Sequence, residues 1–436
     1  MKPQSPPARA SLKDRLRQFF PTLLGAFLAL SLLKFGNPAI LDKLITQPAN
    51  FYEWLLTAWP IHLSYWLLAA LALCGALCVL WRSLKPDWLA TIPLVWLAWQ
   101  LVASTRTVNT ELTLATMKYF AACVVCFYLG YLVLGRERRL TGFWLALLAG
   151  CALMLWSGVD QRFGGLEATR QHFYLYVYPQ LTNPPPELLK RMASDRIFAT
   201  LFYPNALAGA VLLLLPALLA FVWSLEGRLT AAARGFLMGL LTLAALGCLY
   251  WSGSKGGWLL MLAVGLVALW RTLNDRRLKL ALVAAVLVLG LAGFAWRYAA
   301  FFQRGATSVG ARFDYWQAAL TVTRENPLLG TGPGTFYVNY QRIKKPESEM
   351  SRLVHNDYLQ QACDSGLPGL LSYALFVGGV LVVGWRKLAS RFDWLTFGVW
   401  LGLLGFSLQG LLEFGLYIPA LAWPAFVLMG WLLAKE

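Results

Sequence analysis

The stretch ATLFYPNALAGAVLLLLPALLAFVW, residues 199–223, decides the fold class of this chain. Its 25 residues include no charged side chain. A helix needs about 20 apolar residues to cross the hydrocarbon core of a bilayer, and this run exceeds that length. The stretch therefore predicts a transmembrane helix.

The composition of the whole chain agrees with this prediction. Of its 436 residues, 58% are hydrophobic and 14% are charged, whereas soluble proteins carry about 25% charged residues. These values exclude a secreted disulfide scaffold, a disordered protein and an ordinary cytosolic enzyme. The chain has 38 Lys and Arg against 21 Asp and Glu, a net charge of +17. In a membrane protein such an excess belongs to cytoplasmic loops and to external sites for anionic substrates. We therefore expect membrane lipids, and no nucleic acid, as partners.

Other apolar runs follow the same rule along the chain. The predicted spans are 19–35, 61–81, 88–104, 115–134, 142–159, 199–223, 235–252, 257–270, 279–296, 366–385, 394–412 and 416–433. No small-residue cleavage site follows the first span, which is predicted to be a retained helix. The predicted fold is an all-α polytopic membrane protein with about 12 transmembrane helices and a large outer loop before the tenth.

The basic residues predict the direction of the spans. If the N-terminus is cytoplasmic, the inner segments hold 20 of the 38 basic residues, and the short outer loops hold few. Short loops obey the positive-inside rule, so both termini should face the cytoplasm. Most of the remaining basic residues fall in two long outer segments, 160–198 and 297–365. Long loops on one face of a helical bundle are typical places for a functional site.

Cysteines, histidines and acidic pairs give no metal or redox motif. The C-x-x-C pair Cys123 and Cys126 lies inside an apolar span, where packing is the better interpretation. The three histidines have no companion at ligand spacing. Glu347 and Glu349 could resemble the paired carboxylates that hold a metal in some membrane glycosyltransferases, but a solvated loop fits their basic neighbours better. We predict neither a metal nor a cofactor.

Two short outer stretches could bind an anion. RIFATLFYPN, residues 196–205, contains Arg196 and Asn205, which can point into a cavity or serve as an interfacial charge and a helix cap. WSGSKGGW, residues 251–258, is a tight turn whose glycines and Lys255 resemble an anion nest. A plain inter-helix turn with a lysine at the lipid headgroups explains the second stretch about equally well.

The longest polar stretch lies before the tenth predicted span. It begins with RFDYWQAAL, residues 312–320, continues with NPLLGTGPGTF, residues 326–336, and ends with HNDYLQQACDSGLPG, residues 355–369. The last segment predicts a short helix that His355 opens. A helix N-terminus and nearby arginines disfavour imidazolium, so His355 would be a neutral imidazole able to accept a proton. A hydrogen-bonded structural histidine is the alternative.

Together these stretches resemble the O-antigen ligase family, whose members share the Wzy-type polymerase and ligase domain. The resemblance covers roughly residues 196–420. It rests on the order and spacing of Arg196, Pro204-Asn205, Ser254-Lys255-Gly256, Arg312, Trp316, Gly330-x-Gly332-x-Gly334-x-Phe336, His355, Leu359 and Gly366-x-x-Gly369. Relatives usually show arginine where Lys255 stands. Lysine keeps the charge but lacks the bidentate fork of arginine.

The resemblance implies a metal-independent, inverting glycosyl transfer at the periplasmic face of the bacterial inner membrane, with both chain termini in the cytoplasm. The donor would be a glycan on undecaprenyl diphosphate. His355 would act as general base on an acceptor hydroxyl. Arg196, Lys255 and Arg312 would bind the diphosphate, with Asn205 beside them as a further substrate-binding residue.

The identity of the acceptor stays open among three members of the same reaction class. Lipid A–core would make the protein an O-antigen ligase of lipopolysaccharide biosynthesis, which the motif set favours. A growing glycan would make it a polymerase, and a protein hydroxyl would make it an O-oligosaccharyltransferase. A carrier or flippase for the lipid-linked glycan is the alternative of another class, although the sequence shows no inverted pair of broken helices.

The resemblance also divides the chain. Residues 1–18 are predicted to be a cytoplasmic tail, and 19–198 to be the N-terminal transmembrane helices with the first long periplasmic segment. The O-antigen ligase-like catalytic region is 199–420, including the periplasmic loop 297–365. Residues 421–436 are the end of the last helix and the cytoplasmic C-terminus.

Overall fold

The computed structural model describes residues 12–45, 47–79, 88–181, 184, 189, 192–303 and 307–435. Within these residues the chain is helical and has no β-strand, so the predicted all-α class is confirmed. Residues 1–11 of the predicted tail lie outside the described residues, and the next residues begin helix α1 at Leu12. Several basic residues counted for the loops also lie outside them, namely Arg82, Lys85, Lys190, Arg191 and Arg304.

Each predicted span overlaps one long helix of the structure. These helices are α1 (Leu12–Lys34), α3 (Ile61–Cys78), α4 (Trp88–Ser104), α5 (Thr110–Tyr128), α6 (Thr141–Asp160), α9 (Pro204–Trp223), α10 (Ala231–Ser252), α11 (Lys255–Thr272), α12 (Arg276–Gln303), α15 (Asp357–Ser390), α16 (Trp394–Gln409) and α17 (Pro419–Ala434). Eight helical segments among the described residues are long and apolar enough to cross a membrane, and α4, α16 and α17 are shorter apolar helices. The chain is therefore a polytopic membrane protein.

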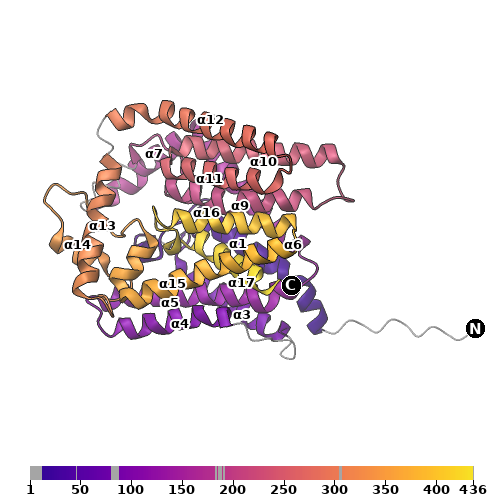
Figure 1. Cartoon of the computed structure of the whole chain (residues 1–436). Helices are drawn as coiled ribbons and strands as arrows, with labels where there is room; N and C mark the ends of the chain where they lie inside the picture. The colour runs from indigo at the N-terminus through magenta and orange to yellow at the C-terminus, as the bar shows by residue number, and fades with distance from the viewer. Residues whose placement is uncertain are drawn as a thin grey trace, which may run out of the picture.

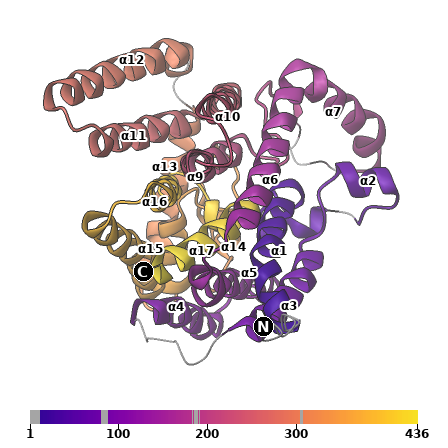
Figure 2. The same ribbon diagram turned by 90° about the vertical axis from the view of Figure 1, so that its right-hand side faces the viewer.

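The buried centre of the bundle is formed by α9, α16 and α17. Nearly every residue of α17 and most residues of α9 are buried, because other helices surround them (Figure 1). Helices α9 and α16 pack backbone to backbone, since a Cβ on Gly402 would lie 2.0 Å from the carbonyl oxygen of Leu213. Small residues allow such close helix contacts in membranes. Helix α12 differs: it lies outside α11 at the edge of the bundle (Figure 2), and Tyr298 is its buried residue.

The longest connection between the membrane helices folds at one end of the bundle. Helices α13 (Thr307–Glu325) and α14 (Phe336–Ile343) lie at this end, opposite the start of α1 and the end of α17 (Figure 1). They have a small apolar core of their own, which includes Tyr315, Phe336 and Tyr340. The predicted large loop before the tenth span is therefore a folded cap on the helices.

Smaller elements connect the long helices. They are η1 (Ala39–Leu44), α2 (Phe51–Leu56), η3 (Leu129–Val133), η4 (Leu134–Arg136), η5 (Gln161–Gly165), α7 (Leu166–His172), η6 (Phe173–Val177), η7 (Tyr178–Gln180) and η8 (Gly415–Tyr417). Helix α9 begins at Pro204, a residue suited to a first helical turn, so the predicted start of this span at residue 199 was five residues too early.

Candidate functional site

The glycine-rich loop between α13 and α14 is held by a buried carboxylate of α15. Asp364 accepts the backbone N–H groups of Gly334 at 2.9 Å and of Phe336 at 3.1 Å. Gly330 has φ +62°, and a Cβ there would lie 2.4 Å from the carbonyl carbon of Asp364. Only glycine fits such an approach without strain. The G-x-G-x-G-x-F motif therefore fastens the cap to the start of α15.

His355 lies just before α15, in a conformation that side chains rarely adopt. Its φ is +55°, which lies in the left-handed region. The prediction that His355 opens the helix was wrong by two residues, because α15 begins at Asp357. Asn356 caps the helix by accepting the N–H groups of Tyr358 and Leu359, each at 3.0 Å. The N–H of Val354 donates to Gln360 at 2.8 Å. Bonds on both sides thus maintain the strained backbone at His355.

Glu413 connects His355 with two of the predicted substrate-binding residues. Its Oε2 lies 3.1 Å from Nδ1 of His355, while its Oε1 accepts from Nδ2 of Asn205 at 2.5 Å and from the guanidinium of Arg312. Burial alone would raise the pKa of the Glu413 carboxyl, but Arg312 and His355 outweigh it and lower that pKa. Since an ionised carboxylate only accepts hydrogen bonds, Nδ1 carries the imidazole proton. Nε2 is then the nitrogen that can take a proton.

The turn that carries Glu413, residues 410–416, is fixed against the start of α15. The N–H of Asp357 donates to the carbonyl of Gly410 at 2.6 Å, and the carboxylate of Asp357 accepts the N–H of Leu416 at 2.9 Å. Nδ2 of Asn356 donates to the carbonyl of Leu411 at 3.0 Å. These bonds explain why Glu413 and His355 meet although they are distant in the sequence.

Arg196 joins Asn205 to the turn between α10 and α11. Its NH2 donates to Oδ1 of Asn205 at 2.8 Å and its Nε donates to the carbonyl of Ser252 at 2.6 Å. Burial lowers the pKa of the Arg196 guanidinium, against the opposite effect of Glu413. Two N–H bonds to the protein fix the direction of the guanidinium and leave it further donors for a ligand.

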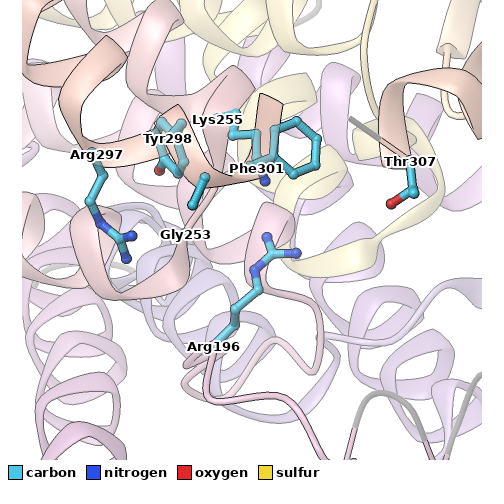
Figure 3. A pocket seen from close by; sticks show the side chains of 8 residues that line it. Arg196, Gly253, Lys255, Arg297, Tyr298, Phe301 and Thr307 are labelled. Atoms are coloured by element: carbon cyan, nitrogen blue, oxygen red, sulfur yellow. The ribbon is translucent and has the colours of Figure 1, made fainter. Parts of the chain in front are cut away.

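A cavity of about 500 Å³ lies beside Arg196 (Figure 3). Its lining contains three cations and no acidic side chain among the described residues: Arg196, Gly253, Lys255, Arg297, Tyr298, Ala300, Phe301 and Thr307. The ammonium of Lys255 lies 3.8 Å from the centre of the Phe301 ring and 5.2 Å from that of Tyr298. The guanidinium of Arg297 lies 4.8 Å from the Tyr250 ring. Aromatic faces hold these cations without neutralising them, so the cavity suits an anion.

The five predicted site residues form two neighbouring groups, which one hydrogen bond connects. Arg196 and Lys255 line the cavity. Asn205, Arg312 and His355 surround Glu413. The bond from Arg196 to Asn205 joins the two groups. Lys255 has no hydrogen bond to this group; it faces the same cavity as Arg196.

Two residues of the site were not predicted from the sequence. Glu413 is an isolated carboxylate near the end of an apolar stretch, which is a signal for an intramembrane functional group. Arg297 ends a long apolar run and was counted only among the outer basic residues. No group of three or more His, Cys, Asp or Glu that could hold a metal occurs within the described part of the chain. The prediction of a metal-independent reaction stays a prediction.

Known proteins resemble part of this chain. Residues 240–374 match the model of the family described as O-Antigen ligase, and this range contains Lys255, Arg312 and His355. A Haemophilus influenzae protein described as "Uncharacterized protein" is 29% identical over 150 residues, which cover 29% of this chain and 37% of that protein. The chain thus aligns with less than half of the length of this relative. The similarity of this chain to the O-antigen ligase family therefore lies in residues 240–374.

Proposed function

We propose that the protein is an inverting glycosyltransferase that moves a glycan from undecaprenyl diphosphate to an acceptor hydroxyl. The observation that carries this proposal is the bonded group in which Glu413 contacts both His355 and Arg312. A proton acceptor and a phosphate-binding cation are the two functions that such a transfer needs. We further propose that this end of the bundle is the periplasmic face of the bacterial inner membrane, with both termini in the cytoplasm.

The proposed reaction uses His355 as general base. The acceptor oxygen forms a bond to the anomeric carbon, and the bond from that carbon to the diphosphate oxygen breaks. The acceptor proton passes to Nε2 of His355, and the electron pair leaves with undecaprenyl diphosphate. Attack from the face opposite the leaving group inverts the anomeric configuration. General-base catalysis of this kind contributes about 10²–10⁴-fold to a rate.

The cations bind the donor in this proposal. Arg196 and Lys255 line the cavity, where their charge is not neutralised by a lining carboxylate among the described residues. Arg312 lies at the Glu413 end of the site and completes the donor contacts, while Asn205 orients Arg196. Fixed cations stabilise the negative charge that grows on a departing diphosphate, so the mechanism needs no metal.

We propose lipid A–core as the acceptor, which would make the protein an O-antigen ligase, as the description of the matched family suggests. Polysaccharide polymerase and protein O-oligosaccharyltransferase activities use the same donor chemistry and stay alternatives. A carrier for the lipid-linked glycan would need the cations but would make no use of His355, whose Nε2 has no hydrogen bond to any described residue. The geometry around His355 therefore favours a transferase.

One assay distinguishes these functions. The purified full-length protein is incubated with glycan-linked undecaprenyl diphosphate and separately with lipid A–core, a glycan acceptor and a serine peptide. The proposal predicts one glycosylated product, formed without nucleotide and in the presence of a chelator. Donor binding without any product on the three acceptors would support the carrier, and loss of product with chelator would contradict the metal-independent mechanism.

A further inference from the structure

The two oxygens of Glu413 serve different parts of the site. Oε1 accepts from Asn205 and Arg312 on the donor side, whereas Oε2 contacts Nδ1 of His355 on the acceptor side. Arg312 also donates from Nε to the carbonyl of Leu412 at 3.1 Å, beside the same carboxylate. A change in the charge around Arg312 therefore alters the electrostatic effect of Glu413 on His355, because Glu413 contacts both residues.

We infer that Glu413 is a positioning residue that couples the two substrates: when a diphosphate occupies the cationic cavity, His355 becomes a stronger proton acceptor. The inference rests on the proposed roles of His355 and of the cations. Without a donor, the charge of Glu413 is largely balanced by Arg312. A diphosphate in the cavity places negative charge beside Lys255 and Arg196, whose charges interact with that of Arg312. It thus competes with Glu413 for Arg312, so more of the Glu413 charge acts on His355.

This coupling between donor binding and the proton affinity of His355 fits a reaction in which the donor binds before the proton is transferred. His355 gains proton affinity only after the donor is in place, and the imidazolium formed in the reaction is then paired with Glu413. When undecaprenyl diphosphate leaves, Arg312 again balances Glu413, and the proton is released more readily.

The groups around His355 are compatible with this assignment. The titratable and charged groups near the pair are Arg196, Arg312, Tyr315 and Asp357. The ring of Tyr315 stacks on that of His355 with centres 5.7 Å apart, and burial raises the pKa of its hydroxyl, so it stays neutral. Phe414 packs against the imidazole with ring centres 4.7 Å apart. Among the described residues, Glu413 is the carboxylate that contacts the imidazole.

Reciprocity gives a test that needs no catalysis. If a donor raises the proton affinity of His355, then protonation of His355 must strengthen donor binding by the same factor. The affinity for undecaprenyl diphosphate in nanodiscs is measured at about pH 5.5 and at about pH 8, which bracket the ordinary histidine pKa of about 6.5. Ionisation of the probe and of Lys255 affects wild type and variants alike, so the comparison between proteins isolates His355.

We expect the ratio of the two affinities to be at least about fivefold larger in wild type than in His355→Ala, the lower end of typical coupling between sites. His172→Ala, a change at an exposed histidine of α7, should keep the wild-type ratio. In Glu413→Gln the ratio of the two affinities should fall to that of His355→Ala. In Glu413→Asp the ratio should lie between those of His355→Ala and wild type. Equal ratios in wild type and His355→Ala would overturn the inference even if His355 is the base, because this readout is independent of glycan transfer.

Discussion

Nδ1 of His355 lies 3.1 Å from Oε2 of Glu413, although 58 residues separate the two in the chain. The contact joins a histidine inside the family-matched range 240–374 to a carboxylate beyond it. It resembles the pairing in which a buried carboxylate orients a catalytic imidazole and stabilises its protonated form. The same carboxylate also binds Arg312, so the proposed base and a proposed donor-binding residue contact one side chain.

Donor binding at the proposed site should depend on pH through Lys255. Lys255 precedes the predicted span 257–270, and burial together with Arg196, Arg312 and Arg297 lowers the pKa of its ammonium to about 8. Lys255 is therefore a cation below that pH and loses its charge above it. We predict that affinity for undecaprenyl diphosphate falls as the pH rises from about 7 to about 9, well below the ordinary lysine pKa of about 10.4.

Lys255→Arg is the matched variant for this prediction, because a guanidinium stays protonated throughout that range. Binding titrations at several pH values should show a flatter profile for the variant than for wild type. The same decline in both proteins would show that Lys255 does not contribute its charge to the donor.

Arg297 should contribute to the same site. It lines the cavity with Arg196 and Lys255, and its Nε is buried and has no hydrogen-bond partner among the residues that the structure describes. We predict that Arg297→Gln weakens binding of undecaprenyl diphosphate by about tenfold, since a hydrogen bond to a charged group is worth about 1.5–3 kcal/mol. Arg324→Gln removes an exposed arginine at the end of α13 and is the control. Equal affinities of the two variants would exclude Arg297 from the site.

Gly366 should be needed for the stability of the cap. It breaks α15 with φ +70° and ψ −179°, and a Cβ there would lie 2.0 Å from the carbonyl oxygen of Leu328. We predict that Gly366→Ala lowers the free energy of unfolding by at least about 1–3 kcal/mol, the cost of a disfavoured backbone conformation. The melting temperature of the purified protein reports this change.

Gly378→Ala is the matched control for that measurement. It lies in the same helix, and a Cβ there would meet nothing within 4 Å. The change should leave the melting temperature unchanged or raise it slightly, because alanine favours helix over glycine. A similar loss of stability in both variants would mean that the break at Gly366 is not the cause.

The helices could be predicted from the sequence, but several site contacts could not. An apolar run long enough to cross a bilayer has few other structures available, so each predicted span overlaps a helix. The roles of Glu413 and Arg297 depend on which side chains meet across different helices, and neither residue belongs to a local motif. The left-handed backbone of His355 was also unexpected, because the neighbouring Asn356 is held by a bond to Leu411, a contact between distant parts of the chain.

The most direct test of the account is the rate of glycan transfer by His355→Ala, measured with saturating donor and the acceptor that wild type uses. His172→Ala is the control histidine. His355→Ala should be stably folded, should still bind undecaprenyl diphosphate at about pH 8, where an ordinary histidine is neutral, and should transfer about 10²–10⁴-fold more slowly. His172→Ala should transfer at the wild-type rate. A folded His355→Ala protein with the wild-type rate would contradict the central claim that this imidazole is the base.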